Sequence, residues 1–173
     1  MERIHIQGKS AIVIICGPII SGKTSIALKI LNKRKGRYIS YEKLKEAIPR
    51  KATREEQIRA VETMFLQTIE NTIVNQKYAV IETPFIEDRE LSELINHIRT
   101  YGYKSNITLI KVNLPEDIQI DYWQRKRGYK PSKEELLKER EIFERGILSQ
   151  NYSKRGVNEY VITNPNAVKY KFD

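Results

Sequence analysis

A glycine-rich loop near the amino terminus carries the strongest chemical signal in the sequence. Residues 17–24 read Gly-Pro-Ile-Ile-Ser-Gly-Lys-Thr and fit the pattern G-x-x-x-x-G-K-S/T. Glycines let such a loop curl so that backbone N–H groups point at phosphate oxygens, and the helix that follows adds the positive end of its dipole. The motif therefore predicts a site for a nucleoside triphosphate.

The residues of this loop have different expected roles. Lys23 would bind the β- and γ-phosphates, and Thr24 would ligate Mg²⁺ through its hydroxyl. The residues expected to bind the nucleotide are Gly17, Ser21, Gly22, Lys23, Thr24 and Ser25. The expected cofactors are ATP and Mg²⁺. An ordinary glycine-rich turn is the alternative, and the strand-like and helix-like patterns on either side disfavour it.

Two glutamates lie where predicted strands end, at 37–40 and 78–82. Glu82 closes the second of these strands and could hold Mg²⁺ through water, as a phosphoryl-transfer site requires. Glu42 follows the first strand and could accept the proton of an attacking hydroxyl. Each also has a simpler interpretation, Glu82 as a solvated strand end and Glu42 as an acid that stabilises the first turn of a helix.

Two arginines lie late in the chain, between two predicted helices. Arg125 and Arg127 belong to the segment Tyr-Trp-Gln-Arg-Lys-Arg-Gly, a suitable position for a short helical lid at about 122–132. Arginines on a lid could reach over the phosphates, neutralise their charge and shield the reaction from water. A charged, solvated helix end is the alternative.

Apolar segments predict the strands that position these residues. They lie at 11–16, 37–40, 78–82, 106–112 and 160–163, with helical patterns between them. Such alternation implies a three-layer α/β fold, a parallel sheet flanked by helices, with ligands bound beyond the carboxyl ends of the strands. The first ten residues and the tail after Ser149 show no clear pattern.

Three helix starts can be identified from capping signals. Thr53 and Glu56 predict a capping box, as do Ser132 and Glu135, and Pro115 precedes acids that favour a first helical turn. The inward face of the first of these helices is expected to carry Ile58, Val61, Met64, Phe65, Thr68, Ile69 and Ile73. The second should bury Leu136, Phe143 and Ile147.

Length and composition indicate one domain over residues 1–173. The longest apolar run, 11–16, is far too short to cross a bilayer, and no signal-peptide pattern is present, so we expect a cytoplasmic protein without a membrane segment. Cys16, the single cysteine, cannot form an internal disulfide, and its place in an apolar strand indicates a buried structural thiol.

The charge balance favours polyanionic partners. Thirty-one Lys and Arg residues against 22 Asp and Glu give a formal charge of +9. Tyr38 and Tyr41 are interleaved with basic residues and could stack on an unpaired base, although a solvated basic rim is an alternative interpretation. The basic residues before and after the strand at 37–40 are Lys33, Arg34, Lys35, Arg37, Lys43, Lys45, Arg50, Lys51 and Arg54.

The order of these motifs resembles the 5′-polynucleotide kinases, within the P-loop kinase group that also holds zeta-toxin-like and small-molecule kinases. The resemblance covers residues 11–147. Ile-Ser-Tyr-Glu42 takes the place of the strand with the general-base Asp, and Val-Ile-Glu82-Thr-Pro that of the second acidic strand. Arg89 matches a downstream arginine of the family, and Val-Asn-Leu-Pro-Glu-Asp leads to the arginines of the lid.

This resemblance implies a P-loop kinase-like fold and transfer of the γ-phosphate of ATP to the 5′-hydroxyl of RNA or DNA. Glu42 would deprotonate the hydroxyl, Lys45 would help bind the acceptor, and Arg89 would contact its neighbouring phosphate. The sequence departs from the family in having Glu at both acidic positions, Lys45 instead of an arginine that can bind phosphate bidentately, and Thr-Pro-Phe at 83–85 instead of Asn-Thr.

Two other functions remain open. A kinase for a nucleoside, sugar or antibiotic hydroxyl would use the same phosphate machinery with a closed acceptor pocket. A nucleotide-dependent binding or regulatory module would bind ATP without turnover, because the Glu substitutions had removed catalysis.

Overall fold

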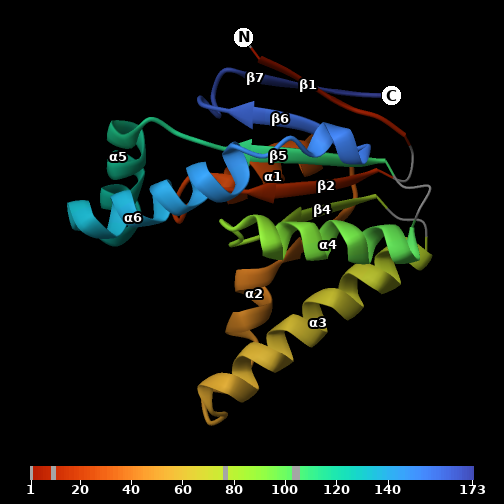
Figure 1. The fold of residues 1–173 in the computed structure, drawn as a ribbon, viewed down its shortest axis with the longest axis horizontal. Coiled ribbons are helices and arrows are strands. Elements are labelled where there is room, and N and C mark those ends of the chain that lie inside the picture. Colours follow the sequence, from red (N-terminus) through yellow and green to blue (C-terminus); the bar gives the residue numbers. More distant parts are fainter. Residues whose placement is uncertain (1, 9–10, 76–77, 103–105) are drawn as a thin grey trace.

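A five-stranded parallel sheet forms the centre of the fold, in the order β3-β4-β2-β5-β6 (Figure 1). The computed structural model describes residues 2–8, 11–75, 78–102 and 106–173. The strands are β2 (Ile12–Cys16), β3 (Arg37–Ser40), β4 (Ala79–Glu82), β5 (Ile107–Val112) and β6 (Asn158–Ile162). All five were predicted from apolar segments, and the three-layer α/β fold is confirmed.

Helices cover both faces of this sheet. They are α1 (Lys23–Lys33), α2 (Tyr41–Glu46), α3 (Arg54–Val74), α4 (Asp88–Tyr101), α5 (Glu116–Arg127) and α6 (Lys133–Phe143). A π-helical turn (Glu144–Leu148) and a 3₁₀ turn (Tyr152–Arg155) lead from α6 to β6. Among the described residues, no helix has the length and apolarity needed to span a membrane.

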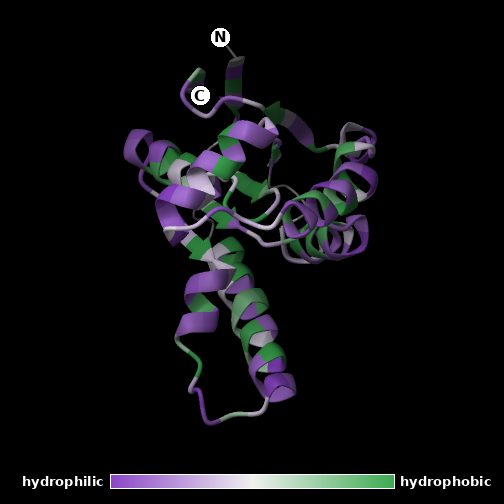
Figure 2. Ribbon diagram, turned by 90° about the vertical axis from the view of Figure 1, so that its left-hand side faces the viewer, coloured by the Kyte–Doolittle hydropathy of each residue, from purple (hydrophilic) through white to green (hydrophobic). Residues whose placement is uncertain are grey.

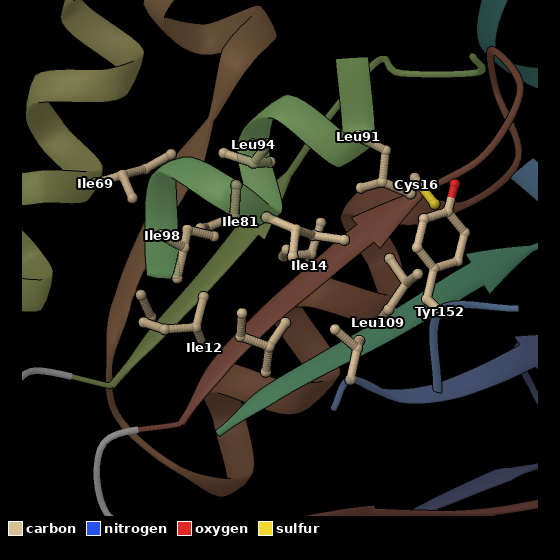
Figure 3. Packing of buried hydrophobic residues seen from close by; sticks show 14 of the residues in the cluster. Ile12, Ile14, Cys16, Ile69, Ile81, Leu91, Leu94, Ile98, Leu109 and Tyr152 are labelled. Atoms are coloured by element: carbon tan, nitrogen blue, oxygen red, sulfur yellow. The ribbon is translucent and has the colours of Figure 1, made fainter. Parts of the chain in front are cut away.

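The central strand β2 is buried on both faces, which explains its unbroken apolar sequence. Ile12 and Ile14 point towards α3 and α4, in the cluster that Figure 3 shows. Val13 and Ile15 point to the opposite face and pack with α1. Because β2 is fixed from both sides, the loop that leaves its carboxyl end starts from a rigid position.

A second, two-stranded parallel sheet lies beside β6 (Figure 1). It pairs β1 (Glu2–Ile6) with β7 (Val168–Phe172), so both segments without a clear sequence pattern contain strands. Ile4, Ile6 and Tyr170 of this sheet join the core on the α1 side. Its strands are short, and each depends on a partner more than 150 residues away, which explains why local sequence patterns did not reveal it.

Both predicted capping boxes are present. At the start of α3 the Thr53 amide donates to Glu56 Oε2 at 2.8 Å, and the Glu56 amide donates to Thr53 Oγ1 at 3.3 Å. Ser132 and Glu135 repeat the arrangement at the start of α6. Pro115 is the N-cap residue of α5, as predicted. These caps fix where α3, α5 and α6 begin.

The predicted inward face of α3 is wrong at two positions in its amino-terminal half, Ile58 and Met64, although Val61 between them is buried as predicted. Ile58 is 44% exposed and Met64 37% exposed, whereas Phe65 and Ile69 are buried. The reason is that α2 and the first half of α3 leave the sheet together as a helical arm, residues 41–64, which Figure 2 shows extending from the body. The six-residue α2 is too short to cover the whole apolar face of its partner.

A buried ion pair connects β5 to β6. The Lys111 side chain is 3% exposed, and its Nζ lies 2.8 Å from Glu159 Oε2 and donates to the carbonyl oxygen of Gln150 at 2.9 Å. Nearby, burial raises the pKa of the Cys16 thiol to about 12, in agreement with the structural role expected for this residue.

Replacing Lys111 with methionine should lower the free energy of unfolding by roughly 3 kcal/mol, because Glu159 would keep its charge without its cationic partner. Denaturant unfolding of the single variant and of Lys111→Met/Glu159→Gln checks this. The double variant should recover most of the loss. A single variant within about 0.5 kcal/mol of the wild type would show that the pair contributes little.

Candidate active site

The glycine-rich loop joins β2 to α1 in a tight curve. A Cβ at Gly17 would lie 2.7 Å from the carbonyl oxygen of Val112, so no larger residue fits there. Gly22 is the N-cap residue of α1 with φ 84°, in the left-handed region that glycine adopts without strain. Ile20 also has a left-handed φ of 52°, an unfavourable conformation for a β-branched residue. The surrounding contacts therefore impose the shape of the loop.

The Lys23 ammonium spans this curve. Its Nζ donates to the carbonyl oxygens of Gly17 and Pro18, both at 2.8 Å. Burial lowers the pKa of Lys23, while the carboxylates of Glu82 and Glu139 act in the opposite direction. The cation is thus held against the loop and lines the cavity, partly buried, where it would attract an anion.

Glu82 receives hydrogen bonds from two different elements. It is only 8% exposed at the end of β4, and its Oε1 accepts from Thr24 Oγ1 at 2.8 Å. Its Oε2 accepts from the hydroxyl of Tyr38 on β3. Burial and the bond to Glu82 raise the pKa of Tyr38 above its ordinary value, so the tyrosine remains a donor.

The donor set at this point suits Mg²⁺. The Thr24 hydroxyl and the Glu82 carboxylate are hard oxygen ligands, and their facing oxygens are 2.8 Å apart. Mg²⁺ in nucleotide sites is held by one or two such protein groups together with phosphate oxygens and water. The two residues predicted as metal ligands are therefore adjacent, next to the loop lysine.

A cavity of about 1030 Å³ opens at the carboxyl edge of the sheet. It brings together residues from the loop, α2, β4, α5 and α6. The predicted site residues that line it are Ser21, Gly22, Lys23, Thr24, Ser25, Glu42, Lys45, Glu82, Arg125 and Arg127. Gly17, the first residue of the loop, is not among the lining residues and contributes through its carbonyl oxygen, which accepts a hydrogen bond from Lys23. Residues far apart in the sequence thus share one cavity with the loop.

Arg89 is not among the residues that line this cavity. It lies in the first turn of α4, its side chain is 85% exposed, and its Nε contacts Glu93 Oε1 at 3.1 Å on the same helix. Its role in acceptor binding, which came only from the resemblance, stays a prediction.

The short helix α2 presents Glu42 and Lys45 to the cavity. Ser40 caps this helix by accepting a hydrogen bond from the Lys43 amide at 3.4 Å. Tyr41 anchors α2 on α3, because its ring packs against the Phe65 ring with 5.3 Å between the two ring centroids. Glu42 lies in the first turn and is exposed, so its carboxylate is free to meet a ligand in the cavity.

The predicted lid forms part of a helical hairpin. Arg125 and Arg127 lie in the last turn of α5, Gly128 ends the helix with φ 79°, and α6 begins at Lys133. Arg125 pairs with Asp121 one turn earlier, and its side chain is 73% exposed. Figure 1 shows α5 and α6 at the carboxyl edge of the sheet. Closure of this hairpin remains a prediction.

Gln119 and Glu139, which the sequence did not single out, hold the tip of the loop at Ile19. Gln119, which is 1% exposed, donates from Nε2 to the carbonyl oxygen of Ile19 at 2.7 Å. The Ile19 amide donates to Glu139 Oε2 at 3.2 Å, and Arg140 donates to Gln119 Oε1 at 2.8 Å. A polar residue one turn before the buried Trp123, on the inward face of α5, was the signal available for Gln119.

Part of the basic sequence lies away from the cavity. Arg37 pairs with Ala79 where β3 and β4 begin, whereas Ser40 pairs with Glu82 where they end. Lys33 and Arg34, where α1 ends, are therefore at the opposite edge of the sheet from the site. Arg34 is held there by the carbonyl oxygen of Gly8 at 2.9 Å. Of the basic residues around β3, Lys45 lines the cavity.

The two tyrosines expected to stack on a base are engaged within the protein. Tyr38 binds Glu82, and Lys43 Nζ lies 4.8 Å from its ring centroid. Tyr41 packs edge-on against Phe65 and Phe85. The structure does not favour a stacking role for either ring.

Comparison with known proteins gives a fold but no close relative. No protein-family model matches the chain. No curated protein matches it either. Solved structures do match. A chain of the Pnkp1/Rnl/Hen1 RNA repair complex is 14% identical with a TM-score of 0.68, over 82% of this chain and 46% of that chain. This chain thus spans about half the length of that RNA repair protein.

Two other matches span nearly the whole of both chains. The tunicamycin resistance protein of Deinococcus radiodurans is 14% identical with a TM-score of 0.61, over 92% of this chain and 88% of that chain. A gluconokinase from Sinorhizobium meliloti is 13% identical with a TM-score of 0.58, over 92% and 86%. At such low identities the likeness shows the fold alone, the parallel α/β sheet flanked by helices that these proteins share with this chain.

Proposed function

We propose that this chain is an ATP-dependent phosphotransferase that moves the γ-phosphate to a hydroxyl group. The observation that carries the proposal is the single cavity that contains the loop lysine, the Thr24–Glu82 pair, the exposed Glu42 and two arginines. Phosphoryl transfer needs these four kinds of group and little else from the protein. A general nucleotide-binding module would have no need of an exposed carboxylate opposite the phosphates.

Each residue has a chemical part in the reaction. The loop amides and Lys23 bind the β- and γ-phosphates, and Thr24 and Glu82 hold Mg²⁺, which neutralises phosphate charge when bound. Arg125 and Arg127 reach the transferred group from α5. The α5–α6 hairpin, with residues 122–132 as its lid, closes over the nucleotide and excludes water.

Glu42 acts on the acceptor. It accepts the proton of the acceptor hydroxyl as the oxygen attacks the γ-phosphorus, the bond to the β–γ bridging oxygen breaks, and ADP leaves. The proton on Glu42 then passes to solvent. Its position on α2, across the cavity from the loop, leaves room for the acceptor between them.

The first candidate for the acceptor is the 5′-hydroxyl of RNA or DNA. The order of motifs over residues 11–147 supports it, as does Lys45, which stands one turn from Glu42 in the cavity and can bind a phosphate as a point charge. The likeness to a chain of an RNA repair complex is in agreement.

The second candidate is the hydroxyl of a small molecule, and two observations favour it. Arg89 lies outside the cavity, and Glu46 lines the same side as Glu42, so two carboxylates and a single lysine of α2 face the acceptor. These two carboxylates weaken the attraction of the α2 side of the cavity for a polyanion, whereas a neutral sugar or a cationic compound would not be disfavoured there.

Steady-state kinetics with a panel of acceptors distinguishes the two. The panel contains 5′-hydroxyl RNA and DNA oligonucleotides of increasing length, nucleosides, and small sugars and aminoglycosides. For a polynucleotide kinase, kcat/KM should rise from nucleoside to oligonucleotide and fall with added salt. Equal activity on nucleosides and oligonucleotides, or activity confined to small compounds, would exclude a nucleic-acid acceptor.

A further inference from the structure

We infer that Tyr38 is a positioning residue that fixes the Glu82 carboxylate for Mg²⁺; this rests on the proposed function. Glu82 is nearly buried, and each of its oxygens accepts a hydrogen bond from a different element. Thr24, on α1, donates to Oε1, and Tyr38, on β3, donates to Oε2. The second of these donors was not expected from the sequence.

The strand register explains how Tyr38 reaches Glu82. Tyr38 pairs with Val80, and Ser40 pairs with Glu82, so Tyr38 lies two residues behind Glu82 on the neighbouring strand. Side chains two residues apart point to the same face of a sheet. Tyr38 and Val80 both pack in the cluster on the α1 side, and the long tyrosine ring spans the remaining distance.

A glutamate at this position needs such a partner. Its side chain has one more rotatable bond than aspartate, so its carboxylate can adopt more orientations at the strand end. Hydrogen bonds to both oxygens leave one orientation, in which Oε1 lies 2.8 Å from Thr24 Oγ1. Tyr38 thereby holds the carboxylate beside the hydroxyl with which it shares the metal.

Tyr38 also connects the metal ligand to the acceptor helix. Lys43 Nζ lies 4.8 Å from the ring centroid of Tyr38, and Lys43 directly follows Glu42 on α2. The hydroxyl of Tyr38 is therefore held by Glu82, and its ring is covered by a cation from α2. A phenylalanine at this position would keep the ring and lose the contacts of the hydroxyl, which are its hydrogen bond to Glu82 and its interactions with Ser40 and Thr24.

Tyr38→Phe tests the inference through binding rather than turnover. The affinity for a fluorescent ATP analogue is measured in EDTA and across a Mg²⁺ titration. Without metal the variant should bind the analogue as the wild type does. In the variant, the Mg²⁺ concentration at which half of the Mg²⁺-dependent increase in affinity is reached should rise about tenfold. An effect of this size is usual when a residue that hydrogen-bonds a metal ligand is lost.

Tyr78→Phe is the matched control. Tyr78 is also a buried tyrosine, and its hydroxyl has no hydrogen-bond partner among the described residues. This variant should keep the wild-type Mg²⁺ dependence. An unchanged Mg²⁺ midpoint in Tyr38→Phe, or an equal loss of affinity with and without metal, would overturn the inference. Failure of the wild type to bind the nucleotide would instead refute the proposed function.

A double-mutant cycle keeps the test decisive if Tyr38→Phe alters stability. Aspartate at position 82 is too short to reach Tyr38, so adding Tyr38→Phe to Glu82→Asp should cause no further change in the Mg²⁺ midpoint. Independent, additive shifts of that midpoint would show that Tyr38 does not act through Glu82.

Discussion

Replacing Lys23 with alanine should slow phosphoryl transfer by about 100-fold or more. This is the usual cost of removing one preorganised group that stabilises the charge developing on the transferred phosphate. The ammonium is held inside the loop by the carbonyl oxygens of Gly17 and Pro18, so it meets the phosphates with little rearrangement. Its partial burial strengthens the attraction. The rate of label transfer from γ-labelled ATP at saturating acceptor measures the effect.

Lys33→Ala is the control for this change. Lys33 is an exposed lysine in the last turn of the same helix, α1, at the opposite edge of the sheet. It should keep the wild-type rate and unfolding midpoint. If Lys23→Ala, folded by circular dichroism, transferred phosphate within about threefold of the wild type, the loop would not be the phosphate site.

Glu42→Gln should lower kcat by roughly 100-fold or more while nucleotide affinity is unchanged, because the variant removes the proton acceptor and keeps the shape of the side chain. Glu42 is exposed in the first turn of α2, so the substitution leaves the core intact. Single-turnover rates and nucleotide titrations measure the two quantities separately.

Glu46→Gln provides the comparison on the same helix. Glu46 lines the same cavity one turn later, where no part in proton transfer is assigned to it. We expect a change in kcat of less than about threefold. Equal losses from the two variants would indicate that the carboxylates act through the overall charge of the cavity, and Glu42 would lose its role as the base.

The strand and the helix on either side of the glycine-rich loop could be predicted because the sequence patterns that indicate them lie within short segments of the chain. The apolar run of β2 and the pattern of residues 17–24 placed a strand, a phosphate loop and α1 in order, and the capping boxes placed α3 and α6. Because carboxyl ends of parallel strands meet at one edge, the sequence predicts Glu42 and Glu82 at the same edge of the sheet, and in the structure both line one cavity.

Other features depend on contacts that the sequence does not encode locally. Pairing of β1 with β7 joins the two ends of the chain, and the exposure of Ile58 follows from the arm leaving the sheet. Tyr38 was grouped with basic residues as a possible stacking side chain, whereas its register beside β4 makes it a partner of Glu82. Gln119 likewise acquires its role from the position of α5 against the loop.

The fate of the γ-phosphate is the most direct test of the central claim. The protein is incubated with γ-labelled ATP, Mg²⁺ and a mixture of 5′-hydroxyl oligonucleotides, nucleosides and small hydroxyl compounds, with Lys23→Ala in parallel. The proposed function predicts label bound covalently to an acceptor with the wild type and almost none with the variant. Label that stays on ATP, is released only as free phosphate, or is transferred equally by both proteins would contradict it.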